Sequence, residues 1–148
     1  MSELKARIDA AVKDAMRARD RVRLGTLRLI TADIKRVEVD ERIDPDDARV
    51  LAILDRMVKQ RVDSESQYRS AGRDDLADVE AAEIAVIREF MPAALSEDEI
   101  ATLVDAAIQS AGAESMRDMG AVMAELKPQL AGRADMGAVS GLVRQRLG

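Results

Sequence analysis

Apolar residues recur three and four positions apart along most of the chain, which is the spacing of one face of an α-helix. The first such face comprises Leu4, Ile8, Ala11, Val12 and Ala15. Ser2 precedes this face and Asp20 precedes the next periodic run, and both residue types are favoured at helix N-caps. The pattern therefore predicts one helix that begins after Ser2 and a second that begins after Asp20.

The second periodic run, 20–42, predicts a helix whose arginines fall mostly outside its apolar face. That face comprises Leu24, Leu27, Thr31 and Ile34. Gly25 weakens the helix slightly and is typical of a position where two helices approach closely.

The run 43–73 carries the start and stop signals of one long helix. Asp44 is predicted as the N-cap, Pro45 as the first helical residue and Gly72 as the stop. An unbroken helix of this length is a rod of roughly 40 Å, since each residue adds about 1.5 Å.

A fourth helix is predicted over 74–91, because Pro92 disfavours helix in the residue before it. Its apolar face comprises Leu76, Val79, Val86 and Phe90. The segment that follows, "MPAALSEDEI", is the best linker in the chain.

Three shorter helices are predicted after this linker. Ser96 and Glu99 form a capping box for the first of them, and Gly112 closes it. The other two are expected over 115–130 and 134–147, separated at "AGRAD". Within the last one, a Gly-x-x-x-Gly pair at positions 137 and 141 favours tight packing against a neighbouring helix.

These elements predict an all-α fold with two domains. Residues 1–92 are expected to form a bundle of about four helices, and residues 96–148 a small three-helix domain. Aromatic residues make up only 1% of the chain, so aliphatic residues and methionine must fill the core, which suits packed helices. Met116, Met119 and Met123 are either part of that core or an adaptable groove for a partner.

The composition excludes several classes of chemistry. The chain has no cysteine and no histidine, so thiol or histidine nucleophilic catalysis and zinc-hydrolase sites are ruled out. Glu80 and Glu83 lack the histidine of a di-iron bundle, so we expect a solvated face and no metal site. No glycine-rich phosphate loop is present, so we predict no cofactor and no catalytic residue. The N-terminus has no apolar run typical of a signal peptide, which favours a cytoplasmic protein without a membrane partner.

The charges are segregated along a chain whose net charge is -5. Basic residues crowd the early helices, among them Arg21, Arg23 and Arg28. Acidic residues dominate from 74 to 105, and the C-terminal segment becomes basic again. Global acidity therefore hides local basic surfaces.

Four motifs in order resemble the GatB/YqeY family, in its stand-alone YqeY-like form. They are "RLGTLRLITADIK", "KQRVDSESQYRSAGRDDL", "EFMPAALSEDEI" and "MGAVMAELKPQLAGRADMGAVSGLVRQRL". The second motif forms a polar helix face, which comprises Lys59, Gln60, Arg61, Ser64, Tyr68 and Arg73. The order and spacing of the last two motifs carry most of the resemblance, which covers essentially the whole chain.

The resemblance implies an N-terminal helical bundle and a C-terminal domain similar to the tail of the B subunit of glutamine-dependent tRNA amidotransferase. That tail grips the body of tRNA, whereas the transamidation chemistry lies elsewhere. The positions that the resemblance assigns to an RNA-contacting surface are Lys127, Gly132, Arg133, Arg144 and Arg146. On this hypothesis, the candidates for an RNA contact in the early helices are Arg21, Arg23 and Arg28.

We therefore expect a non-catalytic tRNA-binding or tRNA-associated module that recognises RNA shape and charge, since two aromatics cannot support base stacking as the main mode. One alternative is a protein adaptor that docks through its acidic or methionine-rich helices. Another is an accessory subunit in carbon–nitrogen ligation with glutamine as amide donor, partnered by an amidotransferase or an aminoacyl-tRNA synthetase.

Overall fold

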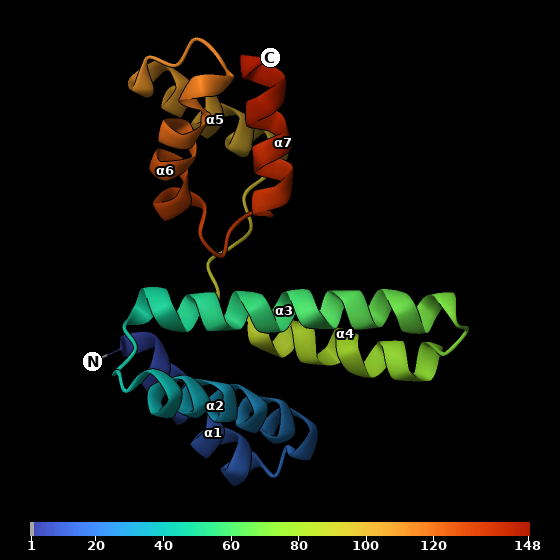
Figure 1. The fold of residues 1–148 in the computed structure, drawn as a ribbon. Coiled ribbons are helices and arrows are strands. Elements are labelled where there is room, and N and C mark those ends of the chain that lie inside the picture. The colour runs from blue at the N-terminus through green and yellow to red at the C-terminus, as the bar shows by residue number, and fades with distance from the viewer. Residues whose placement is uncertain (1) are drawn as a thin grey trace. The chain divides into compact units, whose positions relative to one another are not determined.

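The regular structure is helical in the computed structural model, which describes residues 2–148. These residues form seven α-helices, one short 3₁₀-helix and no strand (Figure 1). The predicted all-α class is confirmed. The chain divides into two compact units, Met1–Pro92 and Ala93–Gly148, and each is described by itself.

The first two helices begin where their caps were predicted. Helix α1 spans Glu3–Ala18, and the Ser2 hydroxyl accepts a hydrogen bond from the Lys5 amide at 3.0 Å. Helix α2 spans Arg21–Glu41, and the Asp20 carboxylate accepts from the Arg23 amide at 3.1 Å. Both N-cap predictions are confirmed, because local side-chain chemistry decides these starts.

Helix α3 spans Asp47–Ser70, and its predicted N-cap at Asp44 is wrong. The cap is Asp46, whose carboxylate accepts from the Arg49 amide at 2.9 Å. The next residue, Asp47, accepts hydrogen bonds from the Ser2 hydroxyl and the Leu4 amide of α1. This contact with a distant helix end accompanies the start at Asp47, two residues later than predicted.

Helix α4 spans Asp74–Arg88, and its apolar face differs from the predicted one. Its buried residues are Ala77, Ile84 and Ile87, whereas Val79 is 54% exposed. Residues two apart lie on different sides of a helix, so a face centred on Ala77 turns Val79 to the surface. The expected core position at Val79 is therefore wrong.

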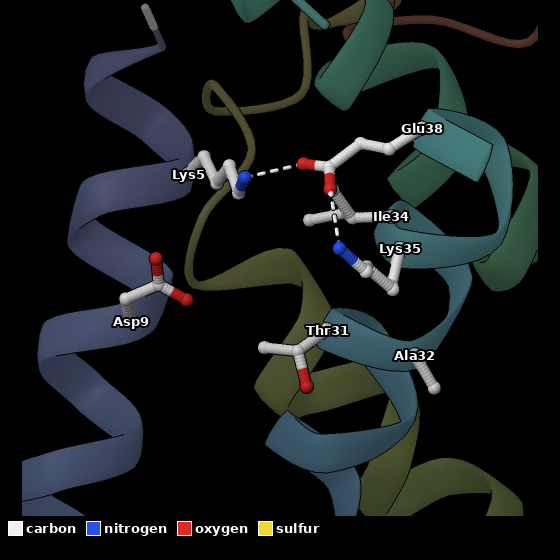
Figure 2. A pocket seen from close by; sticks show the side chains of 7 residues that line it. All are labelled: Lys5, Asp9, Thr31, Ala32, Ile34, Lys35 and Glu38. Atoms are coloured by element: carbon white, nitrogen blue, oxygen red, sulfur yellow. Dashed lines mark hydrogen bonds and ion pairs between the residues drawn. The ribbon is translucent and has the colours of Figure 1, made fainter. Parts of the chain in front are cut away.

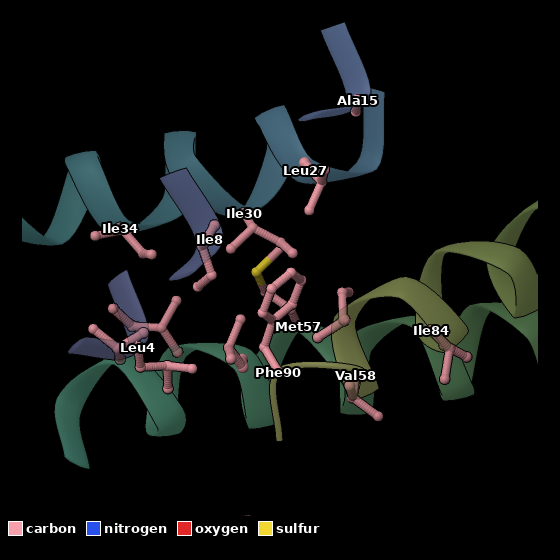
Figure 3. Close-up of a cluster of buried hydrophobic side chains, with 14 residues drawn as sticks. Leu4, Ile8, Ala15, Leu27, Ile30, Ile34, Met57, Val58, Ile84 and Phe90 are labelled. Carbon is pink, nitrogen blue, oxygen red and sulfur yellow. The ribbon is translucent and has the colours of Figure 1, made fainter. Parts of the chain in front are cut away.

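The core of the N-terminal unit lies between α1, α2, the first half of α3 and the end of α4 (Figure 3). Leu4 and Ile8 of α1 meet Ile30 of α2 there, and Phe90 follows α4 into the same cluster. In Figure 1, α3 and α4 run side by side as a long antiparallel pair. The second half of this pair carries fewer buried residues and a polar interface, described below.

The C-terminal unit packs three short helices around a purely aliphatic core. Its elements are α5 (Glu97–Ala111), a 3₁₀-helix (Met116–Asp118), α6 (Met119–Leu130) and α7 (Met136–Leu147). The core comprises Val104, Ala107, Val122, Leu126, Leu130, Val139 and Val143. The capping box at Ser96 and Glu99 and the left-handed stop at Gly112, with φ of 61°, are confirmed.

Two further sequence-based expectations for this unit are settled by packing. A Cβ atom at Gly141 would meet nothing within 4 Å, and at Gly137 only the Asp135 carboxylate at 3.4 Å, so the Gly-x-x-x-Gly pair packs against no helix of its unit. Met119 and Met123 are partly buried against the aliphatic core, so they are core residues, whereas Met116 is 44% exposed. Among residues 2–148, no helix is long and apolar enough to cross a membrane.

Candidate nucleic-acid interface

The loop between α6 and α7 is held in place by Arg133. Gly132 adopts a left-handed conformation with φ of 71°, which favours glycine. The Arg133 carbonyl accepts a hydrogen bond from the Leu95 amide at 2.9 Å. The Arg133 side chain donates from Nε to the Ala93 carbonyl at 3.3 Å. Gly132 and Arg133 therefore shape the loop and tie the segment before α5 to it, a role that the sequence alone did not reveal.

The start of α7 is occupied by its own cap. The Asp135 carboxylate accepts a hydrogen bond from the Gly137 amide at 3.0 Å. A carboxylate at this position satisfies one of the free N–H groups and repels a phosphate. The start of α7 is therefore a poor place for a phosphate.

The other basic residues of this unit divide into free and paired groups. Lys127 on α6 and Arg144 on α7 are exposed and make no side-chain hydrogen bond or ion pair within residues 2–148. Arg146 forms an ion pair with Asp105 of α5. Because Arg144 and Arg146 are two residues apart on α7, they point to different sides of the helix. Among the residues predicted in this unit, Lys127 and Arg144 are thus the two whose side chains are exposed and have no partner.

The α2 candidates divide in the same way. Arg23 forms an ion pair with Glu89, the C-cap residue of α4. Arg21 and Arg28 are exposed, and among the described residues their side chains have no ionic or hydrogen-bonding partner. Arg23 therefore helps join α2 to α4, whereas Arg21 and Arg28 remain available to a partner.

The polar face of the second motif joins α3 to α4. Arg61 Nε donates to Glu83 Oε2 of α4 at 2.7 Å, and its guanidinium also donates to the Met57 carbonyl at 3.2 Å. The Arg61 and Glu83 side chains are only 15% and 21% exposed. Burial raises the pKa of the neighbouring Glu80, and the negative charge of Glu83 raises it further. The solvated face expected at Glu80 and Glu83 is therefore a half-buried ionic interface.

The remaining residues of the polar face differ in exposure and in their ion-pair partners. Lys59 pairs with Asp55 one turn earlier at 3.1 Å, and Arg73 pairs with Asp75 at 3.1 Å. The exposed residue Gln60 and the half-buried residues Ser64 and Tyr68 complete the set.

Sequence reasoning missed Arg69 as a member of this interface. Its guanidinium contacts Glu65 at 3.1 Å, Asp78 at 3.1 Å and Asp74 at 3.5 Å. These hydrogen bonds, led by the one with Asp78, raise its pKa. The signal was the acidic run that opens α4, which faces the basic residues of α3 across the turn.

A shallow groove separates α1 from α2 (Figure 2). Lys5 bridges the two helices by an ion pair with Glu38, and Lys35 lies 3.7 Å from the same carboxylate. The hydrogen bond between Lys5 and Glu38 raises the pKa of Lys5 and lowers that of Glu38. Asp9 faces the same groove, so its charges are mixed and it offers no uniform site for an anion.

Comparison with known proteins identifies the family. The family model described as Yqey-like protein matches residues 5–147, so the chain belongs to the YqeY-like family. A relative from Pyrenophora tritici-repentis, named altered inheritance of mitochondria protein 41, mitochondrial, is 29% identical over 146 residues, which cover 96% of this chain and 80% of the relative.

Proteins of the same name from two other organisms show higher identity over shorter regions. The Meyerozyma guilliermondii protein is 39% identical over 80 residues, covering 54% of this chain and 42% of the relative. The Eremothecium gossypii protein is 36% identical over 104 residues, covering 68% and 57%.

These names contradict the expectation of a cytoplasmic protein, since they describe the relatives as mitochondrial. That expectation rested on the lack of an apolar signal sequence. Mitochondrial targeting segments are amphipathic and basic, so the lack of an apolar run gives no information about this location.

Proposed function

We propose that this protein is a non-catalytic tRNA-binding module whose C-terminal unit contacts the RNA backbone through Lys127 and Arg144. The observation that supports the proposal most is the free positive charge of these two exposed side chains on α6 and α7. A positive side chain without an internal partner can neutralise a phosphate without first breaking an ion pair.

The distribution of charge within the unit supports the same surface. Residues 119–148 contain four basic and two acidic side chains, whereas residues 93–118 contain one basic and six acidic side chains. An RNA backbone is therefore attracted to the α6–α7 hairpin and repelled by α5. The acidic side of the unit restricts the orientations in which RNA approaches, which favours recognition of a defined shape.

Arg133 acts in this proposal as a positioning residue. Its Nε is used by the Ala93 carbonyl, and its terminal guanidinium nitrogens make no hydrogen bond within residues 2–148. Arg133→Ala removes the bond to Ala93 as well as a positive charge, so this variant alone does not separate binding from folding. Lys127 and Arg144 have no such structural contact, which makes them the informative positions.

The experiment is fluorescence anisotropy of labelled bulk tRNA titrated with the full chain at low and at physiological salt, with duplex DNA as competitor. The proposal expects saturable binding that an excess of duplex DNA does not displace. The Lys127→Ala/Arg144→Ala variant should bind at least about tenfold more weakly, a loss of roughly 1.4 kcal/mol. A matched control is Lys13→Ala/Arg56→Ala, which removes two exposed, unpaired charges of the N-terminal unit. Equal losses in both double variants, or no binding at low salt, would refute the proposal.

A further inference from the structure

The surface of α2 that faces away from the core carries an apolar stripe with heptad spacing. Its apolar members are Val22, Gly25, Leu29, Ala32 and Val39, and it is interrupted at Arg36, which pairs with Asp33 at 3.2 Å. The six positions follow one another at alternating steps of three and four residues. All six are exposed. Val22 is 74% exposed, Leu29 44% and Val39 62%. A helix seam of this spacing is the kind that a second helix covers.

A basic row flanks the stripe along one side. Arg21, Arg28 and Lys35 recur at seven-residue intervals on α2, and Arg42 continues the interval at its C-cap. Within residues 2–148 the side chains of the three arginines have no ion pair or hydrogen bond, and Lys35 is 73% exposed with Glu38 at 3.7 Å. The three arginines therefore present positive charge that no side chain within residues 2–148 neutralises, whereas Lys35 already lies beside Glu38. The opposite flank of the stripe carries Asp33 and Asp40.

Gly25 supplies an independent observation at the centre of the stripe's first half. A glycine inside a helix costs about 1 kcal/mol relative to alanine. A Cβ atom at Gly25 would meet nothing within 4 Å, so the close helix approach expected from the sequence does not occur within the unit. The small surface at Gly25 and Ala32 instead leaves room for the backbone of an external helix to come near.

We propose that the outer stripe of α2 is a docking site for an amphipathic helix of a partner protein that carries acidic residues along one flank. Apolar side chains of the partner would cover Val22, Leu29 and Val39, while its carboxylates would pair with Arg28 and Lys35. The apolar stripe favours a protein over RNA, because a phosphate backbone gains nothing from exposed valine and leucine. A second copy of the chain fits less well. Antiparallel α2 helices would set the two basic rows against each other. Parallel helices would set each row against Thr26, Asp33 and Asp40 of the other copy, of which Thr26 is buried and Asp33 already pairs with Arg36.

The test uses a fluorescent three-heptad peptide with leucine at both core positions of each heptad and glutamate at both flanking positions. Its like charges oppose self-association, and a peptide with lysine at the flanking positions is the control. The full chain should bind the acidic peptide saturably in an anisotropy titration and bind the lysine peptide at least about tenfold more weakly.

Two pairs of variants locate the site. Leu29→Asp should weaken binding of the acidic peptide by about tenfold or more, whereas Val79→Asp, a similarly exposed position on α4, should leave it unchanged. Arg28→Glu should weaken binding similarly, whereas Arg88→Glu on α4 should not. Circular dichroism of each variant checks that its helix content is intact.

Four results would overturn the docking site. Both peptides fail to bind, or Val79→Asp weakens binding as much as Leu29→Asp does. In a third, light scattering shows a dimer that Leu29→Asp dissociates, which assigns the stripe to a second copy. Loss of tRNA binding in Arg28→Glu, with peptide binding intact, would assign the row to RNA instead. Because Lys127 and Arg144 lie in the other unit, failure of this docking site leaves the proposed RNA surface to its own test.

Discussion

The half-buried ion pair between Arg61 and Glu83 should be the strongest single polar contribution to the N-terminal unit. Arg61 donates to the Glu83 carboxylate at 2.7 Å and to the Met57 carbonyl at 3.2 Å, with only 15% of its side chain exposed. Arg61→Met preserves much of the aliphatic volume but removes both donors and leaves Glu83 beside Glu80. Hydrogen bonds to charged groups contribute about 1.5 to 3 kcal/mol, so we expect the free energy of unfolding to fall by about 2 kcal/mol.

The control is Lys59→Met, half a turn earlier on the same helix. Lys59 pairs with Asp55 at 3.1 Å, but 54% of its side chain is exposed. An exposed pair of this spacing contributes about 0.3 to 0.5 kcal/mol. Both variants replace a paired cation on α3 by methionine, so their difference compares a half-buried contact between helices with an exposed contact within one helix.

Tyr68 makes the assay specific to the N-terminal unit. It is the only tyrosine in a chain without tryptophan, and it lies on α3. Urea unfolding followed by tyrosine fluorescence therefore reports on this unit, while far-ultraviolet circular dichroism reports on both. A midpoint change of about 10 °C in thermal unfolding corresponds to the expected loss in Arg61→Met.

A double-mutant cycle with Glu83→Leu completes the test. If the two side chains stabilise each other, the Arg61→Met/Glu83→Leu variant should be more stable than the sum of the single changes predicts, by at least about 1 kcal/mol. A loss in Arg61→Met no larger than that in Lys59→Met, with no coupling to Glu83, would refute this account of the interface.

Four further predictions concern single positions at helix ends, in a loop and in a helix interior. Gly132→Ala should destabilise the C-terminal unit by about 1 kcal/mol, because φ there is 71°. Gly141→Ala should stabilise the same unit by up to about 1 kcal/mol, because a Cβ atom at this position in the helix interior meets no neighbour. Urea unfolding followed by circular dichroism compares the Gly132→Ala and Gly141→Ala variants. Ser96→Ala should cost about 1 kcal/mol through loss of the capping box, measured in the same way. Hydrogen bonds from the Ser2 hydroxyl and the Leu4 amide lower the pKa of Asp47. The stability that the Asp47 carboxylate contributes is therefore present above the ordinary carboxyl pKa and lost as the pH falls below it. Asp47→Asn should flatten the acid-induced loss of stability in a tyrosine-fluorescence titration.

The parts of the fold that the sequence predicted are those decided within a few residues. Ser2, Asp20 and the Ser96–Glu99 box each satisfy amide groups one turn away, so their chemistry is visible in the local sequence. The predicted start of α3 was wrong because several neighbouring aspartates can act as the N-cap. A contact between Asp47 and the start of α1, 43 residues away, goes with the observed start.

The candidate site was predicted less well, because the partners of its charges are distant in sequence. Arg146 pairs with Asp105, and Arg133 binds the Ala93 carbonyl 40 residues away. A basic motif shows where positive residues occur but does not show which are already paired. The structure separates Lys127 and Arg144 from the rest, and it shows that Val79 and Gly141 lack the packing roles that spacing suggested.

The most direct test of the proposed RNA surface is the salt dependence of tRNA binding. Each phosphate contact contributes about 0.7 to 0.9 to the slope of log K against log salt concentration. If Lys127 and Arg144 each contact a phosphate, Lys127→Ala/Arg144→Ala should reduce that slope by about 1.5, and Lys13→Ala/Arg56→Ala should leave it unchanged. An unchanged slope in the first double variant would contradict the proposal that these two residues contact the RNA backbone.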